Sequence, residues 1–369
     1  MTHHFLNLAP GQTAPVKLFF GEKLGVFDTI DQPFEDIDRF VRLMRSLDWD
    51  EYEKPMQGLR DEFKNADPVE VNQLVDTIAW QWETDTTAAR MLVPTLAPLV
   101  SYDGLNRLYT RIQDNECVHA ATYSEITRYG FADPVQVKLD IMARQAAFER
   151  LRPAIVVFDE MYEASLDYAR GIRPYSQELA DLLLKYLYTL LCMEGTQFAA
   201  SFSVAAYYNL NGKFMPATNN IQKIAQDELR VHVPVGMAVL DHFLRTNEGL
   251  MAFNNCRDWM IKMGSTIVQS EITWNNEVLF KERQSLQGDR ISHSAVKADR
   301  YVHWRQQQTT DFMRLPTVGE RIDAHPIPWI EDWVSISMRQ GSPQEDRPTD
   351  YLLTPVIRRL PAGPMKLPF

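Results

Sequence analysis

The sequence predicts an all-α protein built as a bundle of long helices. Apolar residues recur at steps of three and four through most of the chain, which is the spacing of one helix face. Alternating apolar and polar runs, which would indicate strands, are scarce, and a Gly-rich phosphate loop is lacking. Several helical stretches exceed twenty residues and have short connections between them, as is typical of helical bundles.

The first helical pattern follows an irregular N-terminal segment, residues 1–33, which contains several Pro and Gly residues. Apolar residues from Phe34 to Met44 then lie on one helix face. A second helix is expected to begin at Asp67-Pro68, because Asp is a common N-cap and Pro suits the first helical position. This pattern continues towards Met91.

The remaining helices of the predicted domain, residues 34–340, follow the same rules. Pro94 and Pro98 end or kink the preceding helix, and Asp133-Pro134 repeats the start signal. The stretch 264–273 resembles a strand but fits a helix equally well. Helical patterns cover residues 102–129, 153–170, 176–208, 219–245, 248–262 and 295–313.

The last segment, residues 341–369, has a different composition. Its prolines make a helix improbable, so we expect a flexible tail. Apolar residues within it, including Leu352 and Phe369, suit the docking of a partner protein. Composition does not separate this interpretation from a tail that packs on its own domain.

The overall composition is that of a globular chain and excludes some functions. The chain has 369 residues and a net charge of −11, which argues against a nucleic-acid binder that neutralises phosphates. Three cysteines cannot build a disulfide framework, so we expect a reducing, cytoplasmic compartment. An apolar signal segment and a membrane-spanning stretch are lacking as well.

Four acidic residues interrupt helix stripes that should be apolar. Glu194 is the clearest case, because the preceding residues 182–193 contain a single charge and predict a buried helix. A buried, unpaired carboxylate costs several kcal/mol or shifts its pKa, so a positive group should compensate it. The four acidic residues are Asp85, Glu116, Glu194 and Glu228.

Two of these acids have a histidine one helical turn away. Glu116 and His119 are three residues apart, and Glu228 and His232 are four apart, so each pair shares a helix face. Two such pairs and two further carboxylates form a ligand set for two metal ions, and oxygen and imidazole ligands suit iron or manganese. A single Glu-x-x-His is common by chance, and a lone buried Glu more often pairs with Arg or Lys. The coincidence of all four helices favours a di-metal bundle.

With these residues, the sequence resembles the small, radical-generating subunit of class I ribonucleotide reductase, a family of ferritin-like fold. The resemblance covers about residues 34–335 and includes the order and separation of the acids. It implies that Asp85, Glu116 and His119 hold one metal. It assigns the other metal to Glu194, Glu228 and His232.

The resemblance also implies a radical site at Tyr123, within Glu116-x-x-His119-x-x-x-Tyr123. In the family this tyrosine is oxidised to a stable radical, although an ordinary core tyrosine would fit the same helix face. An apolar cage would protect the radical. Its expected members are Phe198, Phe202 and Ile224.

Further family features correspond to residues that would carry electrons. Trp49 matches a tryptophan that relays an electron, and Asp227 matches the aspartate that links it to a histidine ligand. Tyr351 in the tail takes the place of the mobile tyrosine that passes the radical to the large subunit. The stretch that begins at His325, His-Pro-Ile-Pro-Trp, resembles a family motif that begins with Asn.

One departure concerns the second histidine. The family has Glu-x-x-His, whereas Val231 stands at that position here and His232 follows it. A π-bulge would absorb the extra residue and turn His232 towards the site.

The resemblance implies an oxidoreductase that is active only with a separate large subunit, which reduces ribonucleotides. It further implies a di-iron centre, with manganese as the alternative, and a homodimer. Two other functions remain open at this point. One is a different ferritin-like di-iron oxygenase or desaturase, and the other is a non-enzymatic iron-binding helical protein.

Overall fold

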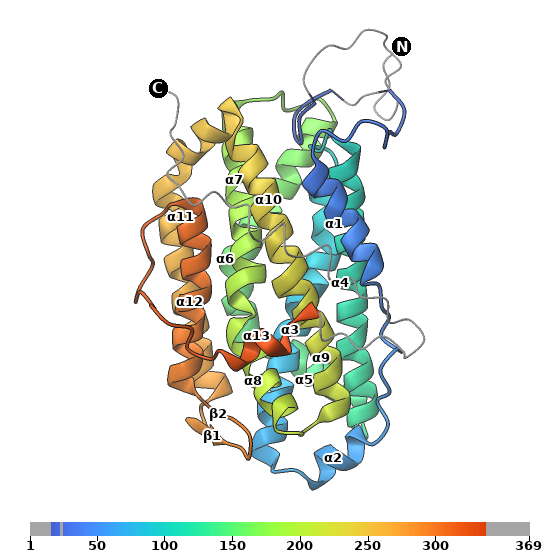
Figure 1. Cartoon of the computed structure of the whole chain (residues 1–369), viewed down its shortest axis with the longest axis vertical. Coiled ribbons are helices and arrows are strands. Elements are labelled where there is room, and N and C mark those ends of the chain that lie inside the picture. The colour runs from blue at the N-terminus through green and yellow to red at the C-terminus, as the bar shows by residue number, and fades with distance from the viewer. Residues whose placement is uncertain (1–15, 23–24, 337–369) are drawn as a thin grey trace.

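The computed structural model describes residues 16–22 and 25–336, and it confirms the all-α prediction. Long helices run side by side along the longest axis of the molecule (Figure 1). The α-helices are α1 (Glu35–Ser46), α2 (Leu59–Asn65), α3 (Pro68–Leu96), α4 (Asp103–Gly130), α5 (Pro134–Met142), α6 (Gln145–Ala169), α7 (Gln177–Cys192), α8 (Ala199–Leu210), α9 (Met215–Asp227), α10 (Val233–Leu244), α11 (Asn247–Trp274), α12 (Ala295–Met313) and α13 (Trp329–Trp333).

Three π-helical turns interrupt or extend these helices. They are η1 (Met193–Gln197), η2 (Glu228–His232) and η3 (Asn275–Leu279). The first joins α7 to α8 and the second joins α9 to α10, so both lie within continuous helical rods. A two-stranded antiparallel hairpin, β1 (Ser285–Gln287) and β2 (Ser292–Ser294), precedes α12.

Local chemistry explains where the predicted helices begin. The Asp67 carboxylate accepts a hydrogen bond from the Val69 amide at 3.0 Å, and Pro68 is the first residue of α3. Asp133 caps α5 in the same manner through the Gln136 amide, also at 3.0 Å. Both predicted starts are confirmed, and α3 ends at Leu96, between the two prolines that were expected to end it.

Other boundaries depend on packing and differ from the prediction. Helix α6 begins at Gln145 and contains Pro153, because buried Ala147 and Leu151 extend its packed face upstream of the proline. Helix α11 continues to Trp274, so the run 264–273 is helical. The short elements α2, α13 and the hairpin were not predicted.

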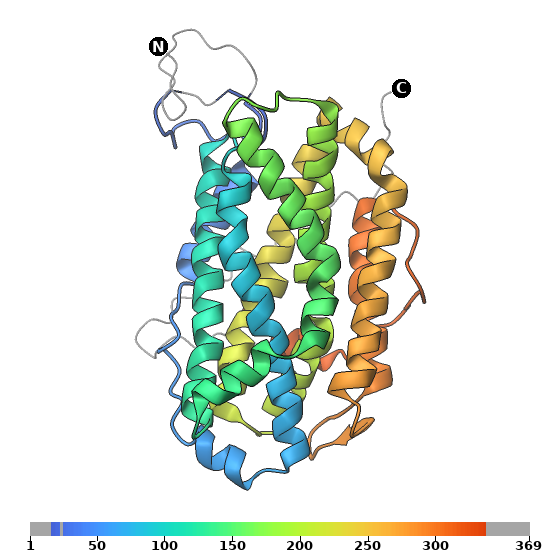
Figure 2. The same cartoon turned by 180° about the vertical axis from the view of Figure 1, so that it is seen from behind.

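The helices that carry the candidate site occupy the middle of the bundle. Helix α3 packs on α4 and α6, and α7 packs on α6, α10 and α11. Figure 2 shows α6 crossing the back of the molecule beside α3. The rods α7–η1–α8 and α9–η2–α10 approach each other where η1 contacts η2. The candidate site therefore lies inside the bundle, between these two rods and helices α3 and α4.

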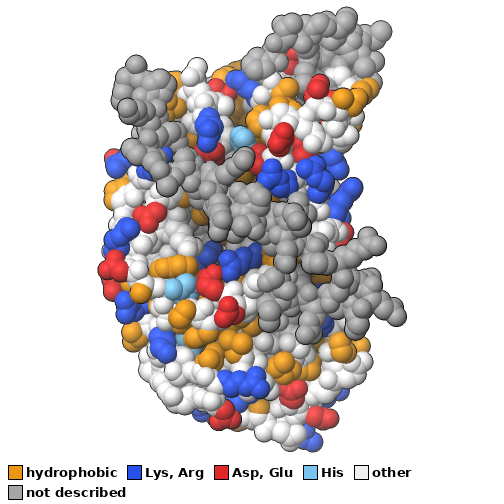
Figure 3. All heavy atoms as spheres, in the orientation of Figure 1, with side chains coloured by type: hydrophobic (Ala, Val, Ile, Leu, Met, Phe, Trp, Pro, Cys, Tyr) orange, Lys and Arg blue, Asp and Glu red, His pale blue; other side chains and the backbone are white. Residues whose placement is uncertain are grey.

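The surface carries both signs of charge. On the face shown in Figure 3, acidic and basic side chains are interspersed with apolar ones. Among the described residues, every helix is either too short or too polar to cross a membrane. The predicted tail, residues 341–369, lies outside the described residues, and so does Tyr351.

Candidate metal centre

The six predicted ligands meet in the middle of the bundle. Helix α3 contributes one acid, α4 an acid and a histidine, η1 an acid, and η2 an acid and a histidine. Each side chain is buried, with at most 6% of its surface exposed. The six are Asp85, Glu116, His119, Glu194, Glu228 and His232.

These residues form two overlapping groups of four, and within each group one ligand atom per residue lies within 4.8 Å of the others. Glu116 and Glu228 belong to both groups. Asp85 and His119 complete one group, and Glu194 and His232 complete the other. The resemblance implied one metal for each of these two carboxylates, and in the structure both carboxylates belong to both groups.

The π-helical turn η2 explains the unusual position of the second histidine. A π-turn holds one residue more than an α-helical turn, so the fourth residue after Glu228 reaches the face that the third would take in an α-helix. His232 Nδ1 lies 2.8 Å from Glu228 Oε2 and 3.1 Å from Glu116 Oε1. Val231 is buried and lines a hollow beside Trp49 instead. The expected π-bulge is therefore present.

The cluster contains buried polar atoms that have no hydrogen-bond partner. They include Asp85 Oδ2, both Glu116 carboxylate oxygens, Glu228 Oε1 and His119 Nδ1. His119 Nδ1 lies 2.9 Å from Glu228 Oε1, but the two atoms lack the geometry of a hydrogen bond. Buried polar atoms in proteins are almost always satisfied. Carboxylate oxygens and an imidazole nitrogen without hydrogen-bond partners are the donor atoms that divalent iron or manganese ions prefer.

The electrostatics of the protein chain alone are unfavourable. Burial, followed by the charges of other carboxylates in the cluster, raises the pKa of Asp85 and of Glu194 well above their ordinary values. Burial would lower the pKa of His232, but the Glu228 and Glu116 carboxylates raise it to about 10. The chain alone thus retains protons on the cluster. Metal ions would replace these protons, since ligands must be deprotonated to bind them.

A second layer of side chains orients both histidines. Asp227 Oδ2 lies 3.2 Å from His119 Nε2 and accepts hydrogen bonds from Trp49 Nε1 at 2.7 Å and Asn115 Nδ2 at 3.1 Å. Asn115 Oδ1 lies 3.0 Å from His232 Nε2. With both Nε2 atoms engaged, both Nδ1 atoms face the cluster.

Asn115 was missed by sequence reasoning, although a signal existed. It precedes His119 by four residues and therefore shares its helix face. Its amide oxygen lies beside His232, and its amide nitrogen donates to Asp227, which contacts His119. Asn115 therefore links the two histidines by way of Asp227.

Trp49 connects this network to a hollow at the surface. Its ring is 9% exposed and stacks on His119 with 6.0 Å between ring centroids. The hollow beside it has a volume of about 380 Å³, and Asp48, Asp50 and Arg111 contribute to its lining. The predicted pair Trp49 and Asp227 is therefore in contact with one histidine of the cluster.

Tyr123 lies on α4, one turn beyond His119, and is fully buried. Its hydroxyl has no hydrogen-bond partner. Burial, and then the Asp85 charge, raise the pKa of Tyr123 well above its usual value, which keeps the phenol protonated. Tyr123 is therefore a buried, protonated phenol close to the Asp85 carboxylate.

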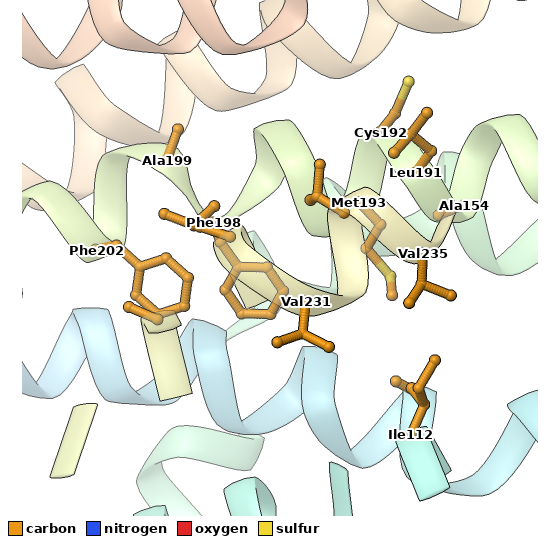
Figure 4. Packing of buried hydrophobic residues seen from close by; sticks show 14 of the residues in the cluster. Ile112, Ala154, Leu191, Cys192, Met193, Phe198, Ala199, Phe202, Val231 and Val235 are labelled. Carbon is orange, nitrogen blue, oxygen red and sulfur yellow. The ribbon is translucent and has the colours of Figure 1, made fainter. Parts of the chain in front are cut away.

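The three predicted cage residues are fully buried as well. Phe198 and Phe202 stack with 5.0 Å between ring centroids and 13° between ring planes (Figure 4). Ile224 lies on α9. Their role as a cage stays a prediction.

The stretch that begins at His325 lies outside the cluster and leads into α13. His325 Nε2 lies 3.0 Å from Glu331 Oε1, and the Ile327 amide donates to His325 Nδ1 at 3.1 Å. Arg230, within η2, donates to Glu331 Oε2 at 2.7 Å. This contact ties α13 to the turn that carries two of the candidate ligands.

The fold and the cluster define a helical-bundle protein with a buried carboxylate–histidine site suited to two metals. The family model of the ribonucleotide reductase small chain matches residues 34–308. The chain belongs to this family, and it is the small (beta) subunit of an oxidoreductase.

Curated relatives match the chain over nearly its whole length. The ribonucleoside-diphosphate reductase subunit beta of Buchnera aphidicola subsp. Baizongia pistaciae is 21% identical over 350 residues, which cover 91% of each chain. The subunit of the same name from Haemophilus influenzae is 22% identical over 350 residues, again with 91% coverage of each chain.

Solved structures agree in fold. The ribonucleotide reductase R2 subunit from Clostridium botulinum has a TM-score of 0.77 at 16% identity, covering 91% of this chain and 99% of that chain. Streptococcus sanguinis dimanganese(II)-NrdF has a TM-score of 0.67 at 14% identity, covering 85% and 100%. Both similarities concern the helical architecture.

Proposed function

We propose that this small subunit generates a radical on Tyr123 and delivers it to a large subunit, which reduces ribonucleotides to deoxyribonucleotides. The observation that carries the proposal is the position of Tyr123, a buried phenol without a hydrogen-bond partner, beside a cluster of bare carboxylate and imidazole atoms. The oxygenase and storage alternatives give no role to such a tyrosine.

The six cluster residues would hold two metal ions, with Glu116 and Glu228 shared between them. When bound, reduced iron or manganese ions would supply electrons to an oxygen-derived oxidant and leave a centre able to oxidise a phenol. Two ions would also bring four positive charges to four buried carboxylates. The donor atoms suit both metals, and one structural relative is named a dimanganese(II) protein.

Forming a neutral tyrosyl radical removes one electron and one proton from the Tyr123 hydroxyl. The Asp85 carboxylate is the group that we assign as the proton acceptor, because its charge acts most strongly on the phenol. The surrounding core excludes water and external reductants, since Tyr123, Phe198 and Phe202 are fully buried. The radical would therefore persist once formed.

Electrons would enter and leave by way of Trp49, through Asp227 and the stacked His119 ring. Onward transfer would use Tyr351 in the tail, residues 341–369, which would also dock the large subunit. We further propose that the protein acts as a cytoplasmic homodimer.

The test is electron paramagnetic resonance after Fe(II) and air are added to the purified protein. We expect a tyrosyl radical signal in the wild type and none in Tyr123→Phe, while both proteins bind equal amounts of iron. Iron uptake without a radical in the wild type would refute the proposal. A radical of equal intensity in Tyr123→Phe would show that the radical forms on another residue.

A second experiment addresses the tail. Deleting residues 345–369 should abolish ribonucleotide reduction with the large subunit, while the radical still forms. Reductase activity that survives the deletion would exclude the docking role.

A further inference from the structure

Helix α13 and the residues that follow it run across the outside of the rod α9–η2 (Figure 1). Trp333 and Val334 are at most 2% exposed. The indole Nε1 of Trp333 donates to Asn209 Oδ1 of α8 at 2.9 Å. The segment 331–335 is therefore anchored in the core by its side chains.

Three side chains along one side of the rod also hold this segment by its main chain. Gln222 Nε2 donates to the Trp333 carbonyl at 2.7 Å, and Gln226 Nε2 donates to the Ser335 carbonyl at 3.0 Å. Arg230 donates to the carbonyls of residues 331 and 334 at 3.2 and 3.3 Å. The last carbonyls of a helix lack partners within the helix, so these donors satisfy groups that α13 leaves open. We call Gln222, Gln226 and Arg230 the clamp.

Arg230 is the member of the clamp that lies within η2. Its Nη2 also donates to Glu331 Oε2 at 2.7 Å, while Glu331 Oε1 lies 3.0 Å from His325 Nε2. The His325 ring in turn lies 4.0 Å from the Trp304 ring, measured between centroids. The Glu331 carboxylate is thus held from two sides, which gives Arg230 a charged acceptor in a fixed place.

The turn η2 carries metal-ligand candidates on its inner side and the clamp on its outer side. Successive residues of a helix lie about 100° apart around the axis, so residues two apart lie on nearly opposite sides. Glu228 and His232 face the cluster, whereas Arg230, between them, faces α13. The five residues of η2 therefore connect the buried cluster with the segment 331–335.

The π-helical turn has an α-helical alternative. A π-turn holds one residue more than an α-helical turn and is rare except as a single turn, frequently at a functional site. In an α-helical register Val231 would take the inner face, His232 would turn away from the cluster, and the side chain of Arg230 would turn relative to α13. The contacts of Arg230 outside and of His232 inside therefore favour the same register. Groups that bind one of two states more tightly shift the population towards that state.

We propose that the clamp holds η2 in its π-helical register and thereby positions His232 for metal binding. This inference rests on the proposed function in one respect, that the cluster binds metal ions. The coupling is reciprocal, because it is a free energy shared by two sites. Loosening the segment 331–335 weakens metal binding at the position that Glu194 and His232 complete, and metal binding tightens the segment.

The first experiment uses the metal-free protein. Hydrogen–deuterium exchange, followed by mass spectrometry, reports how often the amides of η2 open. Gln222→Ala and Glu331→Ala both loosen the segment from outside η2, and we expect η2 to exchange about fivefold faster in each variant. Two variants at separate positions keep the result independent of the folding of one of them.

Gln177→Ala is the matched control for this experiment. It also removes an amide donor to a main-chain carbonyl, that of Glu248 at 3.0 Å, but it lies at the first residue of α7, at the opposite end of that helix from η1. Exchange of η2 that stays as slow as in the wild type in both clamp variants would overturn the proposal. Equal acceleration in the control would overturn it as well.

The second experiment measures Mn(II) binding by isothermal titration calorimetry. In Gln222→Ala and Glu331→Ala, one of the two binding steps should weaken about fivefold, while the other stays close to its wild-type value. The same step should be absent in His232→Ala, which assigns it to the position that Glu194 and His232 complete. Unchanged binding in both clamp variants would overturn the proposal. Equal weakening of both steps would also overturn it, because a general loss of structure does not select one position.

The two proposals can fail separately. A wild type that binds no Mn(II) would refute the proposed metal centre, whereas the exchange of η2 in the metal-free protein would still decide whether the clamp acts. A normal tyrosyl radical in the wild type, together with unchanged exchange and unchanged Mn(II) binding in the clamp variants, would refute the clamp alone.

Discussion

Two clusters of buried charge in the same bundle are compensated in opposite ways. In the first, the Arg150 guanidinium forms an ion pair with Glu271 and lies 3.6 and 3.7 Å from the ring centroids of Trp80 and Trp274. Both charged side chains are at most 2% exposed. In the candidate metal centre, four carboxylates face two histidines. The chain balances the charges in the first cluster, whereas in the second the four carboxylates outnumber the two histidines.

The difference teaches how to distinguish a structural charge from a ligand. A structural buried charge has a partner of opposite sign within the chain, as well as hydrogen bonds such as the one from Arg150 Nη2 to the Gln197 carbonyl. The ion pair also leaves Arg150 Nη1 and Glu271 Oε2 without a hydrogen-bond partner, but in a ligand set several such atoms converge on one another. Removing one partner of the ion pair should therefore destabilise the protein and leave metal binding intact. Removing a carboxylate of the other cluster should instead reduce metal binding and leave the stability of the metal-free protein intact.

The largest expected effect on stability comes from the ion pair. Glu271→Ala leaves Arg150 buried without its partner, which should lower the free energy of unfolding of the metal-free protein by about 3–5 kcal/mol. Urea denaturation measures this change. Glu194→Gln is the contrasting variant, because it removes one of four crowded carboxylates and should not destabilise the metal-free protein. Equal losses in the two variants would remove the distinction between the clusters.

Metal binding should stabilise the protein through the other cluster. At a free metal concentration of 100 times the dissociation constant, one ion adds about 2.7 kcal/mol to the free energy of unfolding. The increment should appear in the wild type, vanish with a chelator, and be absent in Glu228→Ala, which removes a carboxylate common to both groups. Thermal denaturation with and without Mn(II) measures it. A full increment in Glu228→Ala would contradict the shared role.

A smaller change tests the geometry of the ion pair. Arg150→Lys keeps the charge but loses the planar group that lies between two indole rings. We expect a loss of about 1–2 kcal/mol, on the order of a desolvated cation–π contact, with metal binding unchanged. Urea denaturation and metal analysis of the same preparation provide both values. Loss of bound metal would show that the two clusters are coupled.

The smallest effect concerns Glu331, which is paired at the edge of η2. Burial would raise its pKa, but the hydrogen bond with His325 and the Arg230 charge lower it to about 2. Because the folded pKa lies below the unfolded value, this contribution to stability is present above the unfolded pKa and is lost as pH falls through the folded pKa. The stability difference between wild type and Glu331→Gln should shrink as the pH falls from about 5 to about 2. A stability difference that grows on acidification would contradict the lowered pKa of Glu331 in the folded protein.

The sequence predicted those parts of the structure that depend on local chemistry. Asp67-Pro68 and Asp133-Pro134 determine helix starts through caps only two or three residues away, and these starts are confirmed. The spacing of acids and histidines similarly identified residues that the fold brings together. Helical periodicity places a side chain on a face, which is sufficient to select candidates.

Contacts between distant residues could not be predicted. The sharing of Glu116 and Glu228 depends on how η1 and η2 approach each other. The partner of Arg150 lies 121 residues away in sequence, with no local signal to connect the two. Such features follow from packing rather than from local pattern.

The central claim is that the uncompensated carboxylates hold two metal ions and that the self-paired cluster holds none. Equilibrium dialysis of Mn(II) against the metal-free protein, followed by metal analysis, tests it most directly. The account predicts two ions per chain in the wild type and in Glu271→Gln, and fewer than one in Glu228→Ala. A wild type that binds no more metal than Glu228→Ala would contradict it.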